Sequence, residues 1–231
     1  MDLQQTDLYK TQRARVENHV KTALAQDRSL MGLIRLALQA QRSCQENTDS
    51  FNPQDMACLE CDSGCDYCCH PPVSAAVPEV ANIVAYVFNH LPEAEQDRIM
   101  ARVEQVYARV HPMSGPERTS SNIACPYLAE GKCSIYPVRP LACRGFNSTS
   151  RADCQTVFEQ TRKDHQIPAY VPLLASAQGL KEGLLGGLRA SGLKTPLVDL
   201  VRASHKLFAE LEENLERWAR GADVFSDCKP F

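Results

Sequence analysis

The sequence lacks a long apolar run. Among its 231 residues the best apolar stretch covers residues 30–40, and Arg35 interrupts it. A helix that crosses a membrane needs about 20 consecutive apolar residues. The first ten residues, MDLQQTDLYK, also lack the basic start and the apolar stretch of a secretory signal. We therefore expect a cytoplasmic protein that does not contact a membrane.

The chain also lacks a large excess of charge of either sign. It has 25 Lys and Arg against 28 Asp and Glu, which gives a net charge of −3. A surface that binds the phosphates of a nucleic acid is strongly basic, so we expect no nucleic-acid partner. Apolar residues make up 44% of the chain, which is enough for a core and excludes wholesale disorder. The length fits one domain, or one domain with a helical extension.

Motifs of the common enzyme classes are missing as well. No Ser/His/Asp set, paired-carboxylate site or nucleotide-binding motif can be assigned. The glycines within residues 179–192 lack the lysine of a phosphate loop and a preceding strand. We interpret them as sites of close helix packing, or as marks of a loose helix. The sequence leaves open whether the protein is an enzyme and whether it has a protein partner.

Cysteine, in contrast, is abundant. The chain has eleven cysteines, an odd number, and disulfides are rare in the cytoplasm. Five lie within residues 58–69 and four more within residues 125–154, whereas Cys44 and Cys228 stand apart. Core cysteines would instead be spread at helical or strand spacing. Clusters of this kind indicate metal binding by thiolates.

The first cysteine segment, CLECDSGCDYCCH, combines chelating pairs with turn residues. Cys58 and Cys61 are separated by two residues. At this spacing both thiolates can bind one metal ion or one corner of a cluster. Cys65 and Cys68 repeat it. Asp and Gly residues between the pairs favour the sharp bends that bring thiolates together. Since neighbouring side chains diverge, we expect one of Cys68 and Cys69 to ligate one centre. The other should serve a second centre or pack beneath the first.

Two segments carry a family resemblance, CDSGCDYCCH at residues 61–70 and CPYLAEGKCSIYPVRPLACRGFNS at residues 125–148. They resemble the YkgJ-type cysteine-cluster family, also described as the CxxCxxCC zinc- or iron-chelating domain. The first segment departs from a strict C-x2-C-x2-C-C pattern, which would place its first cysteine at Asp62 rather than at Cys61. A flagellin lysine N-methylase carries a similar cysteine domain, which adds one enzyme context to the resemblance.

The resemblance covers about residues 58–160 and implies a set of shared cysteines as metal ligands. These are Cys61, Cys65, Cys68, Cys69, Cys125, Cys133, Cys143 and Cys154. Further candidates are the extra Cys58 and His70, although a supporting or solvent-facing role fits His70 better because cysteines are plentiful.

The donor set is compatible with more than one function. Structural zinc, metal storage or metal delivery is the first hypothesis, and an iron–sulfur redox or enzyme subunit is the second. A thiol oxidoreductase is the third, but its strand–helix setting is missing. The expected cofactor is zinc or iron, the latter as an iron–sulfur cluster, in one centre or two. We expect Arg139 or Arg144 to donate to a ligating sulfur or a carboxylate, and Arg151 to form a surface ion pair.

The rest of the chain has the apolar periodicity of α-helices. We expect a mostly α fold, with irregular cysteine-rich metal-binding loops. Helices are predicted over residues 12–26, 29–43, 78–91, 92–110, 154–166, 172–190 and 196–220. Residues 111–122 are predicted to be an exposed loop, and no run alternates for long enough to predict a strand.

Three segments are expected along the chain. Residues 1–57 form an N-terminal helical segment. Residues 58–166 form the cysteine-cluster metal-binding domain, with a helical hairpin inserted between its two cysteine segments. Residues 167–231 form C-terminal helices that pack on this domain.

Overall fold

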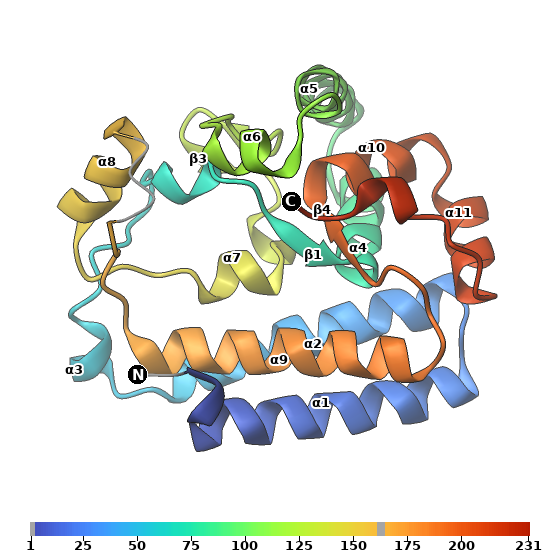
Figure 1. Ribbon diagram of the computed structural model, residues 1–231, viewed down its shortest axis with the longest axis horizontal. Helices are drawn as coiled ribbons and strands as arrows, with labels where there is room; N and C mark the ends of the chain where they lie inside the picture. The colour runs from blue at the N-terminus through green and yellow to red at the C-terminus, as the bar shows by residue number, and fades with distance from the viewer. Residues whose placement is uncertain (1–2, 161–164) are drawn as a thin grey trace.

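The computed structural model describes residues 3–160 and 165–231, and most of these residues are helical (Figure 1). The α-helices are α1 (Asp7–Gln26), α2 (Leu30–Ser50), α3 (Pro53–Met56), α4 (Val77–His90), α5 (Glu93–Val110), α6 (Gly115–Ser120), α7 (Leu141–Gly145), α8 (Arg151–Gln160), α9 (Val171–Ala190), α10 (Leu200–Ala209) and α11 (Leu211–Ala219). The strands are β1 (Ser74–Ala76), β2 (Leu128–Ala129), β3 (Lys132–Cys133) and β4 (Leu197–Asp199). Short 3₁₀ helices are η1 (Leu3–Gln5), η2 (Tyr67–Cys69), η3 (Tyr136–Val138) and η4 (Ser226–Cys228). The expected mostly α fold is confirmed.

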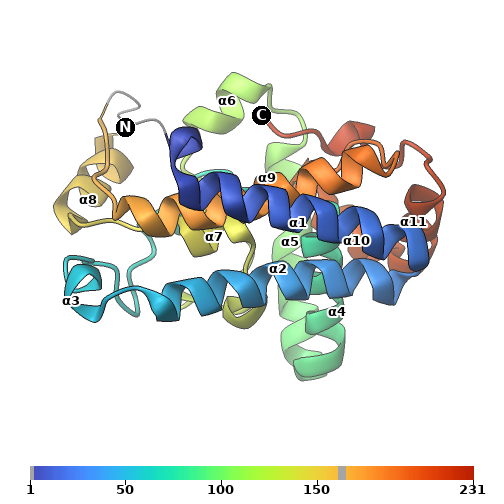
Figure 2. The same ribbon diagram turned by 90° about the horizontal axis from the view of Figure 1, so that it is seen from below.

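Helices α1, α2 and α9 run along one side of the molecule (Figures 1 and 2). Helix α1 begins where Thr6 Oγ1 accepts a hydrogen bond from Tyr9 N at 3.3 Å. Helix α2 begins where Ser29 Oγ accepts one from Gly32 N at 3.1 Å. The helices predicted in this layer are confirmed, although α1 begins five residues earlier and α2 ends seven residues later than expected. The two helices predicted between the cysteine segments are confirmed as α4 and α5.

Helix α9 approaches α1 closely because glycines recur at every fourth position. A Cβ atom on Gly179 would lie 2.6 Å from Tyr9 O, and one on Gly183 would lie 2.5 Å from Arg13 O. Gly187 faces α1 in the same way. Since no side chain fits at these positions, the glycines set the distance between the two helices. The interpretation of these glycines as sites of close helix packing is confirmed.

Strands β1 and β4 form an antiparallel pair that leads into two helices. Their register pairs Ser74 with Asp199 and Ala76 with Leu197. Strand β1 runs directly into α4, and β4 runs directly into α10. The helix predicted over residues 196–220 is therefore wrong at its start, because its first residues pair with β1.

The same predicted helix also breaks in the middle. The chain turns at Glu210, which has a φ of −150°, and α11 leaves in a new direction (Figure 1). A straight helix over residues 196–220 would be about 37 Å long. Helix α10 instead packs on α4 and α5, whereas α11 packs on α2 and α4. The turn thus lets both halves bury an apolar face.

Two further segments differ from the prediction. Helix α6 lies within the predicted loop of residues 111–122 and begins with a capping box. In this box Ser114 Oγ accepts a hydrogen bond from Glu117 N, and Glu117 Oε2 accepts one from Ser114 N at 2.8 Å. Strands β2 and β3 pair Leu128 with Cys133. Strands of two or three residues have no alternation long enough to detect.

The helix predicted over residues 154–166 is confirmed in part. Helix α8 begins earlier, at Arg151, where Ser150 Oγ accepts a hydrogen bond from Asp153 N at 3.2 Å. It is helical as far as Gln160. The next predicted positions, 161–164, lie outside the described residues.

One apolar core unites side chains from most of the chain. It runs from Val16 in α1 to Cys228 in η4, and Trp218, Tyr127 and Phe225 are its largest fully buried members. Figure 1 shows α3, α8 and the loop between α3 and η2 at one end of the molecule. The loop that carries the first cysteine segment therefore lies at this end, whereas Cys125 and Cys133 of the second segment pack against the core. Among the helices of the described residues, none is long and apolar enough to span a bilayer.

Candidate metal centre

The first cysteine segment turns back on itself before η2. Cys65 N donates a hydrogen bond to Asp62 O at 3.2 Å, and Gly64 in this turn has a φ of +94°. Glycine adopts this left-handed conformation without the strain that a Cβ atom would add. Cys69 N then donates to Asp66 O at 2.8 Å. The bend predicted from the turn residues is confirmed.

Helix α8 packs against η2 through aromatic rings. The ring centroids of Tyr67 and Phe158 are 5.5 Å apart, and those of His70 and Phe158 are 4.6 Å apart. This contact brings Cys154, which is buried in α8, to the first cysteine segment. His70 Nδ1 also lies 3.1 Å from Asp66 O. Both contacts of His70 support a role in packing the loop.

The chain before α8 ties the first segment to that helix. Ser148 N donates a hydrogen bond to Cys61 Sγ at 3.2 Å, and Glu60 N donates to Ser148 O at 3.0 Å. Arg151 N donates to Glu60 Oε2 at 2.6 Å. Arg151 Nη1 lies 3.3 Å from Asp62 Oδ1, so the predicted surface ion pair of Arg151 is confirmed. A backbone amide on a cysteine sulfur favours the thiolate form.

The second cysteine segment begins where the chain passes η2. Cys125 N donates a hydrogen bond to Cys69 O at 2.7 Å. The β2–β3 hairpin follows, and its turn residues Glu130 and Gly131 have φ values of 51° and 71°. Positive φ at both positions is what a tight two-residue hairpin requires. The hairpin returns the chain so that Cys133 lies near Cys125, whose pKa it raises.

Helix α7 carries Cys143 and is fixed by a buried carboxylate. Glu79 Oε1 accepts a hydrogen bond from Leu141 N at 2.7 Å, and Glu79 Oε2 accepts one from Ala76 N at 2.8 Å. Burial raises the pKa of Glu79, and these two hydrogen bonds oppose the rise. Glu79 thus joins the start of α4 to the start of α7. The sequence analysis missed it, although an acid inside the apolar run SAAVPEVANIV was a signal.

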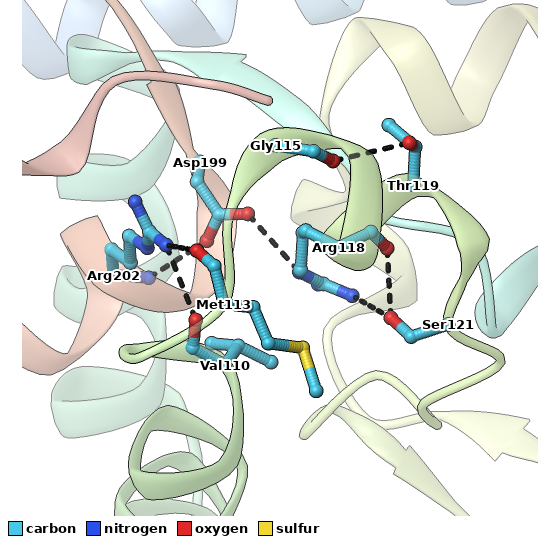
Figure 3. A network of polar contacts seen from close by, with 8 residues as sticks. All are labelled: Val110, Met113, Gly115, Arg118, Thr119, Ser121, Asp199 and Arg202. Carbon is cyan, nitrogen blue, oxygen red and sulfur yellow. Dashed lines mark hydrogen bonds and ion pairs between the residues drawn. The ribbon is translucent and has the colours of Figure 1, made fainter.

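A buried ion pair anchors the chain before Cys125 (Figure 3). Arg118 Nε in α6 lies 3.6 Å from Asp199 Oδ2 at the end of β4, and both side chains are at most 4% exposed. Asp199 Oδ1 also accepts a hydrogen bond from Arg202 N at 2.9 Å. Burial raises the pKa of Cys125 to about 12, and the charge of Arg118 opposes this rise. The sequence analysis found neither member of this pair, because they are far apart in the chain.

The thiols of the first segment and of α8 are electrostatic neighbours. Burial raises the pKa of Cys61, and the charges of Cys65, Cys68 and Cys154 add to the rise. Burial also raises the pKa of Cys65, where Cys68 and Cys154 again contribute. These four cysteines therefore lie within reach of one another's charge.

The thiols of the second segment form a similar neighbourhood. Burial raises the pKa of Cys143 well above its ordinary value, and Cys125, Cys133 and Cys68 add to the rise. Cys69 has Cys125 and Cys133 among its neighbours, and both raise its pKa. Because Cys125 N donates a hydrogen bond to Cys69 O at 2.7 Å, the two segments contact each other at η2.

Cys68 and Cys69 lie where the two neighbourhoods meet. Each of the two adjacent thiols acts on the other, so that the pKa of Cys68 is lowered and the pKa of Cys69 is raised. The charge of Arg139 also lowers the pKa of Cys68. Once one of the two thiols ionises, the other is therefore held protonated.

The predicted hydrogen bond from Arg139 or Arg144 to a sulfur or carboxylate is wrong for the described residues. The guanidinium of Arg139 lies 4.0 Å above the ring of Tyr136. Arg144 Nε donates to Arg139 O at 3.1 Å, and Arg144 Nη2 donates to Pro137 O. Both guanidinium groups thus hold the chain before α7. Arg139 still acts through its charge, which lowers the pKa of Cys133 against the larger effect of burial.

Three cysteines lie outside these neighbourhoods. Cys58 is exposed and its Sγ donates to Asp55 O at 3.0 Å, whereas Cys44 and Cys228 are buried in the core. Within residues 3–160 and 165–231, no three His, Cys, Asp or Glu side chains converge closely enough to hold an ion as they stand. A metal would therefore have to draw the neighbouring thiols together. Their chemistry fits zinc or iron, because both accept all-thiolate coordination.

Comparison with known proteins agrees with this donor set. Residues 60–167 match the model of the CxxCxxCC family, whose description is "Putative zinc- or iron-chelating domain". No curated protein and no solved structure shows significant similarity to the chain. The matched range contains the eight cysteines that the resemblance implies as ligands, the helices α4 and α5, and helix α8. The predicted resemblance to the CxxCxxCC family is therefore confirmed over residues 60–167, which are just under half of the chain.

Proposed function

We propose that this protein binds zinc or iron through the thiolates of its two cysteine segments. The ligands are Cys61, Cys65, Cys68, Cys69, Cys125, Cys133, Cys143 and Cys154. The observation that carries the proposal is the meeting of cysteines from distant parts of the chain. Cys125 N donates to Cys69 O at 2.7 Å, and Ser148 N, three residues before α8, donates to Cys61 Sγ at 3.2 Å.

An all-thiolate donor set favours a module that holds its metal over a hydrolytic enzyme. Catalytic zinc sites leave one position open for water or substrate, whereas structural sites are closed by four protein ligands. The same thiolates suit an iron–sulfur cluster, which would supply electron transfer or serve an enzyme subunit. Cys58 and His70 are not in the proposed set, because Cys58 contacts α3 and His70 packs on Phe158.

The proposal is tested by purifying the chain without oxygen and measuring zinc, iron and acid-labile sulfide. Stoichiometric colourless zinc supports a structural or delivery module. Brown protein with iron and sulfide supports the redox or enzyme function. A well-folded chain without metal, which also fails to take up either metal, contradicts the proposal and favours thiol chemistry.

Two variants make this test specific. Cys143→Ser should lose metal because it removes a ligand on α7. Cys58→Ser should keep the metal content of the parent, because Cys58 is exposed and contacts Asp55 O. Equal metal content in both variants would contradict the ligand assignment.

A further inference from the structure

We propose that Arg139 and Arg144 form a docking site for the carboxylate groups of an acidic segment on a partner protein. Both guanidinium groups lie against η3, within the second cysteine segment. This inference goes beyond the proposed function, because the site would bind a protein ligand through groups that do not ligate the metal. Three observations carry it: the fixed positions of the two guanidinium groups, their unused donors, and the exposed ring beside them.

The two guanidinium groups are held in place before any ligand binds. The guanidinium carbon of Arg139 lies 4.0 Å from the ring centroid of Tyr136. Arg144 Nε donates a hydrogen bond to Arg139 O at 3.1 Å. Gln41 Nε2 in α2 donates to Val138 O at 3.1 Å, which fixes η3 itself. Side chains that are already fixed lose little conformational freedom on binding, so more of the interaction energy is available for affinity.

Both guanidinium groups keep donors that no acceptor uses. In the described part of the chain the Arg139 side chain makes no hydrogen bond, and its Nε is buried without a partner. Its Nη1 and Nη2 are not buried, so they form the edge that a ligand can reach. Arg144 uses Nε and Nη2 for backbone carbonyls, which leaves Nη1 without an acceptor among the described residues. A carboxylate can accept two parallel hydrogen bonds from one such edge.

The charges of these two arginines lack a carboxylate partner. Within residues 3–160 and 165–231, no ion pair joins either group to Asp or Glu, and neither group donates to a cysteine sulfur. Both side chains are half-buried, so water solvates them less than it solvates an exposed arginine, and two like charges against one short element repel each other. By contrast, the exposed Arg217 in α11 is paired with Glu213 at 3.7 Å. A carboxylate from a partner would neutralise the charge that this chain leaves uncompensated.

The ring of Tyr136 favours a protein over a small anion as the ligand. Tyr136 is 58% exposed and forms the surface on which Arg139 lies. Tyrosine and arginine are enriched among the residues that contribute most to the binding energy of protein–protein interfaces. A site for a free anion such as phosphate gains nothing from an exposed ring. We therefore assign the carboxylate to an acidic protein segment.

The test uses a fluorescein-labelled hexaglutamate peptide as the probe and measures its binding to the full chain by fluorescence anisotropy at low salt. The chain has a net charge of −3, so general attraction of an acidic peptide is weak and binding reports a local site. Arg139→Gln should weaken binding about tenfold or more, because it removes charge-assisted hydrogen bonds. The matched control Arg217→Gln removes the same charge from an exposed helix and should bind the peptide as the parent does.

Two further variants separate the geometry of the site from its charge. Arg139→Lys keeps the charge but loses the planar fork, so it should recover only part of the affinity that Arg139→Gln loses. The variant that combines Arg139→Gln with Arg144→Gln should show no saturable binding. Circular dichroism checks the fold of each variant, and Arg139→Gln should keep it because this side chain donates no hydrogen bond among the described residues.

The outcomes separate this inference from the proposed function. A parent chain that does not bind the peptide, or an Arg139→Gln variant that binds it as tightly as the parent, would overturn the docking site. Inorganic phosphate that binds at these arginines more tightly than the peptide does would overturn the assignment to a protein. If Arg139→Gln loses metal while peptide binding is unchanged, the arginine serves the thiolates alone, and only the proposed function remains. A parent that binds the peptide but neither zinc nor iron would overturn the proposed function and keep the docking site.

Discussion

The buried residue Glu79 fixes the start of α7, the helix that carries the proposed ligand Cys143. Its carboxylate is fully buried and accepts hydrogen bonds from Ala76 N and Leu141 N, so it joins two helix starts. Burial raises its pKa above the value of 4.5 that applies to an exposed glutamate. The folded state therefore binds the proton of Glu79 more tightly than the unfolded state does.

This difference predicts a pH effect that a single substitution removes. As pH rises from 4.5 through the raised pKa of Glu79, ionisation should lower the free energy of unfolding of the parent chain. Glu79→Gln does not titrate, so its free energy of unfolding minus that of the parent should increase across this range. At low pH the variant should be less stable by about 1–3 kcal/mol, because the amide leaves one backbone N–H without an acceptor. Urea unfolding of both proteins at several pH values measures this, and a constant difference would contradict it.

The buried Arg118–Asp199 pair predicts a large loss of stability when one partner is removed. Arg118→Met leaves the carboxylate of Asp199 buried without its cation, which should cost about 3–5 kcal/mol in the free energy of unfolding. Adding Asp199→Asn should recover part of this loss, since asparagine can still cap α10. Urea unfolding of the single and double variants forms a double-mutant cycle. Strictly additive effects would show that the two side chains do not interact.

At the scale of elements, the glycines of α9 determine how closely it packs on α1. Gly183→Ala would place a Cβ atom 2.5 Å from the backbone oxygen of Arg13, which cannot move without shifting α1. We expect a loss of about 1–3 kcal/mol in the free energy of unfolding. Gly186→Ala is the matched control, because its Cβ would meet only the flexible end of Glu17.

The control should be neutral or gain up to about 1 kcal/mol from the higher helix propensity of alanine. Thermal and urea unfolding of both variants measure the two effects. Equal destabilisation would mean that any added side chain disturbs α9, and that the close contact with α1 has no special role.

The elements that were predicted correctly carry their signal within their own residues. The elements that were missed depend on contacts with residues far away in the sequence. Long helices such as α1, α5 and α9 repeat an apolar position over several turns, so the pattern is visible in the sequence. Strand β4 has three residues, and it forms because it pairs with β1 more than 120 positions earlier. The turn at Glu210 has no proline or glycine to mark it. Its cause is the packing of α11 on α2 and α4.

At the scale of the whole molecule, metal removal should lower stability without abolishing the fold. The apolar core excludes most of the ligating cysteines, so the helices can pack in the apo protein. Among the described residues, no three thiols lie close enough together to hold an ion. Metal binding should therefore order the cysteine loops. A free metal concentration about 100 times the dissociation constant should add about 2.7 kcal/mol to the free energy of unfolding.

Thermal unfolding with and without a chelator measures this effect. The variant that combines Cys61→Ser, Cys65→Ser, Cys133→Ser and Cys143→Ser should show no response to the metal. A parent chain whose melting temperature is unchanged by the chelator, although the metal has been shown to leave, would contradict the coupling between metal binding and folding.

The sequence by itself determined the helical class, the cysteine-rich segments and the bend at Gly64. These depend on residue type and on spacings of a few positions, which act through local backbone geometry. Only the tertiary structure decided that helix α8 packs against η2, that Cys125 N bonds to Cys69 O, and that Glu79 and Arg118 support the second segment. Contacts between distant residues form because packing of the helices brings their ends together, and no pattern within a short window records which ends will meet.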